Sequence, residues 1–349
     1  MKAAPVLLPA ALLPLAFSPA SGFLGDCTLA LAYAVMALGL NVIVGFAGLL
    51  DLGYVAFYAI GAYTIGWLGS TFVAGVNHGR GWHLLVGESA AHLPGVHVNF
   101  VLVLIAAVAL TSAAGVAIGV PTLRLRGDYI AVVTLAFGEI IGQLAHNGDE
   151  LSIAGQPLTA GPKGITPIDA PAAFSALDLR PWYWLALALA TLVVLASVRL
   201  RDSRLGRAWA AMREDEDAAA SLGVPIVRTK LLAYGTGAAF GGIAGVFLGS
   251  FDNIVSAGQF EFPFSVLILS MVAIGGLGSI PGAVAGAFAL TFANYWLLPR
   301  VIDLSELSYG LYGLLLVVLV LLRSGYRPGS RPSMPENSGV IRRECGYTR

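Results

Sequence analysis

The chain has 349 residues, of which 57% are hydrophobic and only 11% are charged, with 20 basic and 20 acidic side chains. A soluble domain carries about 25% charged residues, so this chain has too few to cover a globular surface with polar groups. The two cysteines, Cys27 and Cys345, lie near opposite ends of the sequence. This composition excludes a soluble enzyme, a nucleic-acid-binding module and a disulfide scaffold, and it predicts a multi-pass membrane protein.

Apolar stretches long enough to cross about 30 Å of hydrocarbon recur along the chain. We therefore predict an all-α integral membrane protein with about ten transmembrane helices, some of which glycines or Pro281 could break or make re-entrant. The predicted spans lie near residues 4–20, 27–46, 52–72, 99–120, 128–146, 182–199, 229–250, 263–280, 282–299 and 307–323. The first also resembles a signal peptide with a cleavage region at 18–21; between the two we favour an uncleaved span.

The distribution of basic residues orients these spans. With the N-terminus inside, the inner segments hold 16 of the Lys and Arg residues and the outer segments hold 4. Basic residues collect on the cytoplasmic side of membrane proteins. We therefore predict that both termini are cytoplasmic, with a transmembrane domain over 1–326 and a disordered cytoplasmic tail over 327–349.

Polar residues at membrane depth are candidates for a translocation path, because an ionisable side chain in hydrocarbon is costly. Glu139 lies well inside its predicted span, and Gln143, four residues on, shares its helix face. Thr134 belongs to the same span but cannot share that face. Glu139 is thus either part of a polar path wall or a protonated or paired residue of the core. Both interpretations stay open.

A second group of polar residues surrounds an expected break in a span. Asn41 and Asp51 flank the sequence Gly45-Phe-Ala-Gly48, and Tyr54 follows shortly after. A broken helix leaves backbone groups unpaired, which is tolerated only against protein or a water-filled cavity. We assign Asn41, Asp51 and Tyr54 to the path as candidates. An ordinary solvated loop carboxylate is the alternative for Asp51.

The sequence shows no familiar catalytic motif. It has no G-x-x-x-x-G-K-[ST] element, so it lacks a phosphate-binding loop, and it contains neither H-E-x-x-H nor G-x-S-x-G. We therefore expect a protein that is not an enzyme and needs no cofactor. Four histidines gather in one outer loop, but their spacing suits no tight zinc motif, so we expect no metal site. They are His78, His83, His92 and His97.

The inner loop over 201–228 is longer than a connection between two spans requires. Ser203 can cap a helix, and Gly223 followed by Pro225 can end it. We expect one helix from Arg204 to Ser221, about 27 Å long, with Trp209, Met212, Ala219 and Ala220 as its apolar contacts. This loop is either a solvated connector or a docking element for a cytoplasmic partner, and its acidic run favours docking. The candidate coupling residues are Gly206, Arg207, Ala208, Arg213, Glu214, Asp215, Glu216, Ala218, Ala219 and Gly223.

The same loop carries a family resemblance. The pattern S-x-x-G-R-A-x-x-A-M-R-E-D-E-x-A-A-x-x-x-G over 203–223 resembles the coupling loop of branched-chain amino acid ABC importer permeases of the LivM type. The other blocks that are similar to this family occur in the same order along the chain: GLLDLGYVAFYAIGAY at 48–63, GDYIAVVTLAFGEII at 127–141, TAGPKGI at 159–165 and MVAIGGLGSIPGAVAGA at 271–287.

The resemblance implies a permease subunit in a bacterial inner membrane that forms part of a path for leucine, isoleucine and valine. It implies three kinds of partner: ATP-binding subunits on the cytoplasmic side, a second permease subunit, and a periplasmic or extracellular substrate-binding protein. Related permeases carry urea, short amides or other amino acids, which remain alternatives. A different class, an ion-coupled secondary transporter, would use Glu139 and Asp51 as coupling sites.

Overall fold

The computed structural model describes residues 4–75, 81–85, 93–122, 129–153, 155–171, 174–175 and 178–297. A helix lies at each of the nine predicted positions within these ranges. They are α1 (Ala4–Ala16), α2 (Gly22–Leu40), α3 (Val55–Leu68), α4 (Phe100–Thr122), α5 (Tyr129–Asn147), α6 (Arg180–Asp202), α9 (Ile226–Phe251), α10 (Phe262–Gly275) and α11 (Ile280–Phe292). The predicted span at 307–323 and the tail at 327–349 lie outside the described residues.

Within the described ranges, five helical segments are long and apolar enough to cross a membrane. The first combines α2 with the π-helix η1 (Asn41–Phe46), so the π turn falls where the sequence predicts a break. The others are α4, α5, α6 and α9. By contrast α3 has only 14 residues, or about 21 Å at 1.5 Å per residue, which is shorter than the hydrocarbon layer.

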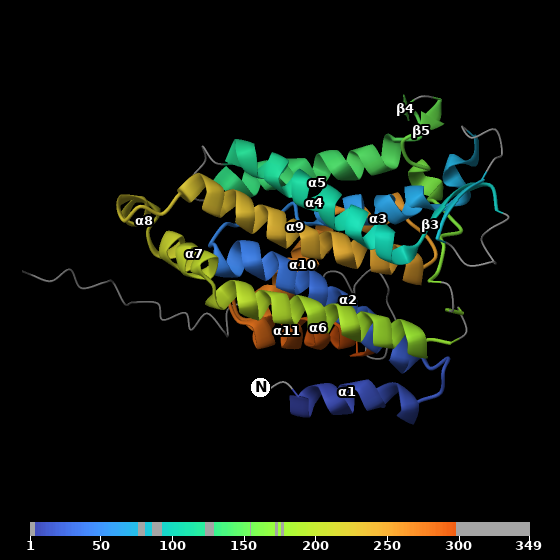
Figure 1. Ribbon diagram of the computed structural model, residues 1–349, viewed down its shortest axis with the longest axis horizontal. Helices are drawn as coiled ribbons and strands as arrows, with labels where there is room; N and C mark the ends of the chain where they lie inside the picture. Colours follow the sequence, from blue (N-terminus) through green and yellow to red (C-terminus); the bar gives the residue numbers. More distant parts are fainter. Residues whose placement is uncertain are drawn as a thin grey trace, which may run out of the picture.

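The helices run side by side in one bundle, with the loops gathered at its two ends (Figure 1). The first long helix occupies the centre, since 94% of its most apolar window is buried. It packs against α6, α9 and α11, while α3 and α4 cover the other side of α9. Glycine permits the closest of these approaches: a Cβ on Gly61 of α3 would collide with the backbone of Gly242 in α9. Small residues of this kind let helices meet backbone to backbone.

One end of the bundle, here called the strand end, carries two small sheets that were not predicted from the sequence. In the first, β3 (Gly95–Val98) pairs antiparallel with β1 (Gly69–Ser70) and parallel with β2 (Gly81–Leu84). The second is the hairpin of β4 (Ser152–Ile153) and β5 (Gln156–Pro157). Short 3-10 turns lie near them: η2 (Thr71–Gly75), η3 (Gly161–Lys163) and η4 (Ala257–Phe260). The chain is therefore mostly helical rather than purely so.

The opposite end carries α7 (Arg204–Glu214) and α8 (Glu216–Ser221), and we call it the α7 end (Figure 1). The turn between α10 and α11 lies there too. Helix α1 is antiparallel to α6, because Pro19 O accepts from Leu179 N and Ala10 O accepts from the Tyr183 hydroxyl. The first described residues therefore point towards the α7 end.

Candidate functional site

The loop over 201–228 folds into two helices, so the prediction of one continuous helix from Arg204 to Ser221 is wrong. Ser203 caps the first as predicted, because its Oγ accepts from Leu205 N and Gly206 N. Asp215 then leaves the helical conformation, at φ −156° and ψ 114°, and its Oδ1 accepts from the N–H groups of Asp217 and Ala218. An aspartate that caps a following helix competes with helix continuation. The acidic run therefore creates a corner.

One face of α7 and α8 packs into the protein itself. Trp209 is fully buried, donates from Nε1 to Thr229 O at 2.9 Å and stacks on Phe46 of η1. Met212 and Ala219 are also buried. The expectation that Trp209, Met212 and Ala219 supply apolar contact to a partner is therefore wrong. Sequence periodicity shows that a helix has an apolar face but not what covers it.

Glu216 serves an internal role as well. Its Oε1 lies 2.7 Å from Lys230 Nζ, and Lys230 is 1% exposed near the start of α9. Removing one partner of a buried pair leaves an uncompensated charge. This pair therefore ties α8 to the core. Lys230 was missed as a site residue, although a single lysine just inside an apolar helix was a usable signal.

The other face of this segment is open to solvent. It presents Arg207, Glu214 and Ala218, together with Leu222, which is 84% exposed. Leu222 was also missed, because one leucine beside a turn glycine gives no periodic signal. Gly223 follows with φ +86° and ends α8 as predicted. Of the remaining coupling candidates, Gly206 is buried, Ala208 is half-buried, and Arg213 and Asp215 are exposed. Ala220, the fourth expected apolar contact, is exposed too.

The predicted path residues near the broken helix are buried and lie together with neighbouring turns. Asn41 Oδ1 accepts from Gly278 N, in the turn between α10 and α11, at 2.8 Å. After η1 the chain turns at Gly48, whose φ is +72°. Arg213 of α7 donates from Nη1 to Gly45 O at 2.6 Å. Three segments distant in sequence thus meet at the α7 end.

Asp51 and Thr134 are brought together beside this break. Gly53 N donates to Asp51 Oδ1 at 2.8 Å, and Leu52 N donates to Thr134 Oγ1 at 3.1 Å. Asp51 is 1% exposed, so the alternative of a solvated loop carboxylate is wrong. Tyr54 is fully buried, and its hydroxyl donates to Gly237 O of α9 at 3.0 Å. These residues anchor the connection between η1 and α3 to α5 and α9.

Glu139 and Gln143 lie elsewhere, on the outer surface of α5. Both are exposed and share one face, as predicted, and Gln143 Oε1 accepts from Asn147 Nδ2 at 3.3 Å. The exposed residues of α4 are all apolar, from Val101 to Val120. The two neighbouring helices therefore present different outer surfaces, one suited to lipid and one with a polar stripe.

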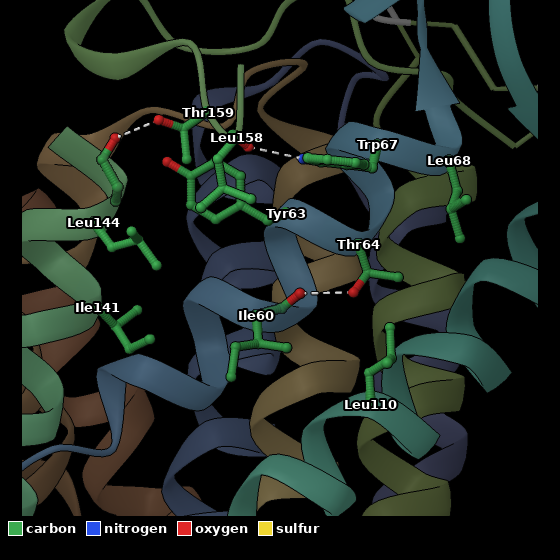
Figure 2. Close-up of a pocket in the computed structure, with 11 residues that line it drawn as sticks. Ile60, Tyr63, Thr64, Trp67, Leu68, Leu110, Ile141, Leu144, Leu158 and Thr159 are labelled. Carbon is green, nitrogen blue, oxygen red and sulfur yellow. Dashed lines mark hydrogen bonds between the residues drawn. The ribbon is translucent and has the colours of Figure 1, made fainter. Parts of the chain in front are cut away.

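A cavity of about 380 Å³ opens among α3, α4 and α5 towards the strand end (Figure 2). Most of its polar side chains are already bonded: Trp67 Nε1 donates to Leu158 O, Thr64 Oγ1 to Ile60 O and Thr159 Oγ1 to Ala145 O. The surface that remains is almost entirely carbon. An amino-acid zwitterion needs partners for both charges, and this lining has no charged side chain. None of the predicted path residues lines the cavity.

The loop histidines that the structure describes form no metal site, since within the described residues no group of three His, Cys, Asp or Glu is placed to hold an ion. His97 is buried, and its Nδ1 lies 2.6 Å from Asp169 Oδ2. The His83 ring stacks on it at 5.4 Å between centroids. His78 and His92 lie outside the described residues.

The sequence was compared with known proteins. Residues 24–320 match the family described as branched-chain amino acid transport system / permease component. The chain belongs to this family. No solved structure matches the chain at a significant level.

Named relatives of this permease family span most of the chain. The high-affinity branched-chain amino acid transport system permease protein LivM of Salmonella typhimurium is 35% identical over 94% of this chain and 75% of its own length. A probable LivM of Methanocaldococcus jannaschii is 27% identical over 87% of this chain and 91% of its own. The Salmonella typhimurium permease protein LivH is 25% identical over 85% and 92%. The similarity to a family of LivM type, inferred from sequence blocks, is thereby confirmed.

Proposed function

We propose that this chain is a permease subunit of an ABC importer in a bacterial inner membrane, and that it carries branched-chain amino acids. The observation that carries the proposal is the α7–α8 segment, which combines a core-bound inner face with an exposed acidic and apolar outer face. A passive connector would need neither. The family match and the LivM and LivH relatives supply the substrate class.

In this proposal the outer face of α7–α8 docks a separate ATP-binding subunit. Glu214, Ala218 and Leu222 are its contact residues, and Arg207 is a charged neighbour. A few central side chains dominate the energy of most interfaces, and Leu222 is the large apolar side chain available here. The α7 end is then cytoplasmic, in keeping with the 16 to 4 division of basic residues and with the direction of α1.

The polar stripe of α5 supports a contact with a second permease subunit. Exposure of Glu139 to hydrocarbon would cost about 2.5 kcal/mol or more. We therefore place Glu139 and Gln143 at the contact with a second permease, where they border the path between the two subunits. A substrate-binding protein would deliver the amino acid at the strand end.

The experiment is reconstitution of the chain with its cognate ATPase, second permease and binding protein in proteoliposomes, followed by uptake of labelled leucine, isoleucine, valine, urea and acetamide. We expect ATP-dependent uptake of the three branched-chain amino acids. Uptake of urea or acetamide instead would show that the proposed substrate class is wrong. Uptake driven by an ion gradient without ATP would refute the proposal.

Variants of the docking face test the role of α7–α8 directly. Glu214→Lys, or a bulky residue at Ala218, should release the ATPase subunit or uncouple hydrolysis from uptake. Arg342→Ala, in the predicted tail, is the control and should do neither. If the docking variants retain both the ATPase subunit and full uptake, the segment is only a connector.

A further inference from the structure

The docking helix α7 reaches the membrane domain through one charged side chain. Arg213 Nη1 donates to the carbonyl oxygen of Gly45 at 2.6 Å. Gly45 lies in the last turn of the broken helix, where carbonyl groups have no following N–H partner. A cation is favourable at a helix C-terminus, and hydrogen bonds from charged donors are stronger than neutral ones. The bond therefore satisfies a backbone group that the break leaves open.

The backbone around Arg213 also fits closely against the turn that follows the break. A Cβ added to Gly48 would lie 2.8 Å from Arg213 Cγ and 3.4 Å from its Cα. On the other side, a Cβ on Gly278 would lie 3.1 Å from Arg213 Nη1 and 3.2 Å from Gly45 O. The arginine thus lies where η1 and the α10–α11 turn meet, and glycines provide the space.

A second hydrogen bond, between two residues of the membrane domain, joins the broken helix to the α10–α11 turn. Asn41 Oδ1 accepts from Gly278 N, and Asn41 is 1% exposed. Its Nδ2 has no hydrogen-bond partner among the described residues, so the side chain is held by this single bond. We call Asn41, Gly45, Gly48, Arg213 and Gly278 the inner junction.

A second side chain of α7, Trp209, also contacts the protein next to the inner junction. Trp209 anchors the helix to the start of α9 and stacks on Phe46. Arg213 lies one turn further on, and it is exposed although its Nη1 bonds to Gly45 O. Both side chains of α7 therefore contact η1, one through an aromatic ring and one through a hydrogen bond. Sequence reasoning expected Arg213 at the edge of the ATPase contact, but its guanidinium points the other way.

We infer that Arg213 is the positioning residue through which a movement of α7 opens or closes the inner end of the path, by holding Gly45 in place beside the Gly278 turn. This inference rests on the proposed importer function. It assigns Arg213 to transmission within the permease and leaves docking to Glu214, Ala218 and Leu222.

The test uses the full reconstituted complex carrying Arg213→Gln, with Arg204→Gln, an exposed arginine of the same helix, as the matched control. A cysteine in place of Ile43, which is fully buried in η1, reports the junction through its rate of thiol labelling, in a background with Cys27→Ala and Cys345→Ser. We expect Arg213→Gln to retain the ATPase subunit while uptake per ATP hydrolysed falls about tenfold, within the usual range of coupling energies. The rate of thiol labelling at position 43 should change on addition of ATP in the control but not in Arg213→Gln. Arg213→Lys should recover part of this change.

Unchanged uptake per ATP in Arg213→Gln, or release of its ATPase subunit, would overturn the inference. If this variant fails to assemble, Asn41→Ser decides, because it breaks the junction from the membrane side without touching α7. It should uncouple in the same way, and normal coupling there overturns the inference. Should the unmodified complex import none of the solutes, the proposed function fails, whereas ATP-dependent labelling at position 43 still reports on Arg213.

Discussion

Polar groups find their hydrogen-bond partners differently at the two ends of the bundle. At the α7 end, the inner junction joins three segments through hydrogen bonds to backbone groups, and glycines allow them to touch. Towards the strand end, the Trp67, Thr64 and Thr159 side chains of the cavity among α3, α4 and α5 bond to nearby carbonyl groups, and the lining exposes mostly carbon (Figure 2). A change at the junction must move backbone, whereas the cavity can accept extra atoms. This difference predicts where the chain tolerates substitution.

The largest effect should come from a methyl group at Gly45. A Cβ there would lie 2.5 Å from Gly278 N, closer than packed atoms can approach. We expect Gly45→Ala to abolish uptake in the reconstituted complex. The control is Gly25→Ala in the same broken helix, where the Cβ would meet only Leu179 at 3.7 Å. Equal uptake by both variants would mean that the junction is not tight.

The next effect concerns the outer face at the α7 end. We expect Leu222→Asp to weaken binding of the ATPase subunit by about 2 kcal/mol, roughly thirtyfold in Kd, as for a central interface residue. Leu222 contacts little of its own chain, so the variant should keep its fold. The measurement is titration of the ATPase subunit against permease in nanodiscs, with Val227→Asp, at the exposed start of α9, as the control. If Leu222→Asp binds the ATPase subunit with undiminished affinity, the docking contact lies elsewhere on the chain.

A smaller effect should follow from the ion pair that ties α8 to α9. Glu216→Gln removes the negative charge beside buried Lys230, and we expect a loss of about 2 kcal/mol in stability, below the full value for a buried pair because Glu216 is one-third exposed. Adding Lys230→Met should restore most of it. Thermal unfolding of the two single variants and the double variant measures the coupling. A double variant that is less stable than Glu216→Gln would contradict this account.

The smallest effect should come from filling the cavity. Leu144→Phe adds bulk where the lining leaves space, so we expect the change in stability to stay within about 1 kcal/mol and uptake to be unchanged. Melting temperature and uptake of labelled leucine check both. A large loss of uptake would place the cavity on the path and break the contrast between the two ends.

The sequence alone predicts much of the local structure. The apolar runs place the described helices, Ser203 marks the start of α7 and Gly223 the end of α8, and Gly45 to Gly48 mark the break after α2. These features depend on neighbouring residues, whose hydrophobicity, capping groups and backbone freedom are readable in order. The strands β1 to β5 escaped prediction because they are two to four residues long and carry too little periodicity.

What the sequence determined by itself is a mostly helical membrane chain with a capped loop over 201–228, because burial in lipid and local capping act through composition and near neighbours. What only the tertiary structure decided is the direction of each functional side chain. Trp209 faces the core, Glu216 pairs with Lys230, and Arg213 turns towards Gly45 rather than outward. These partners lie 20, 14 and 168 residues away along the chain. Only the packing of α7 and α8 against α9 and the broken helix brings them together.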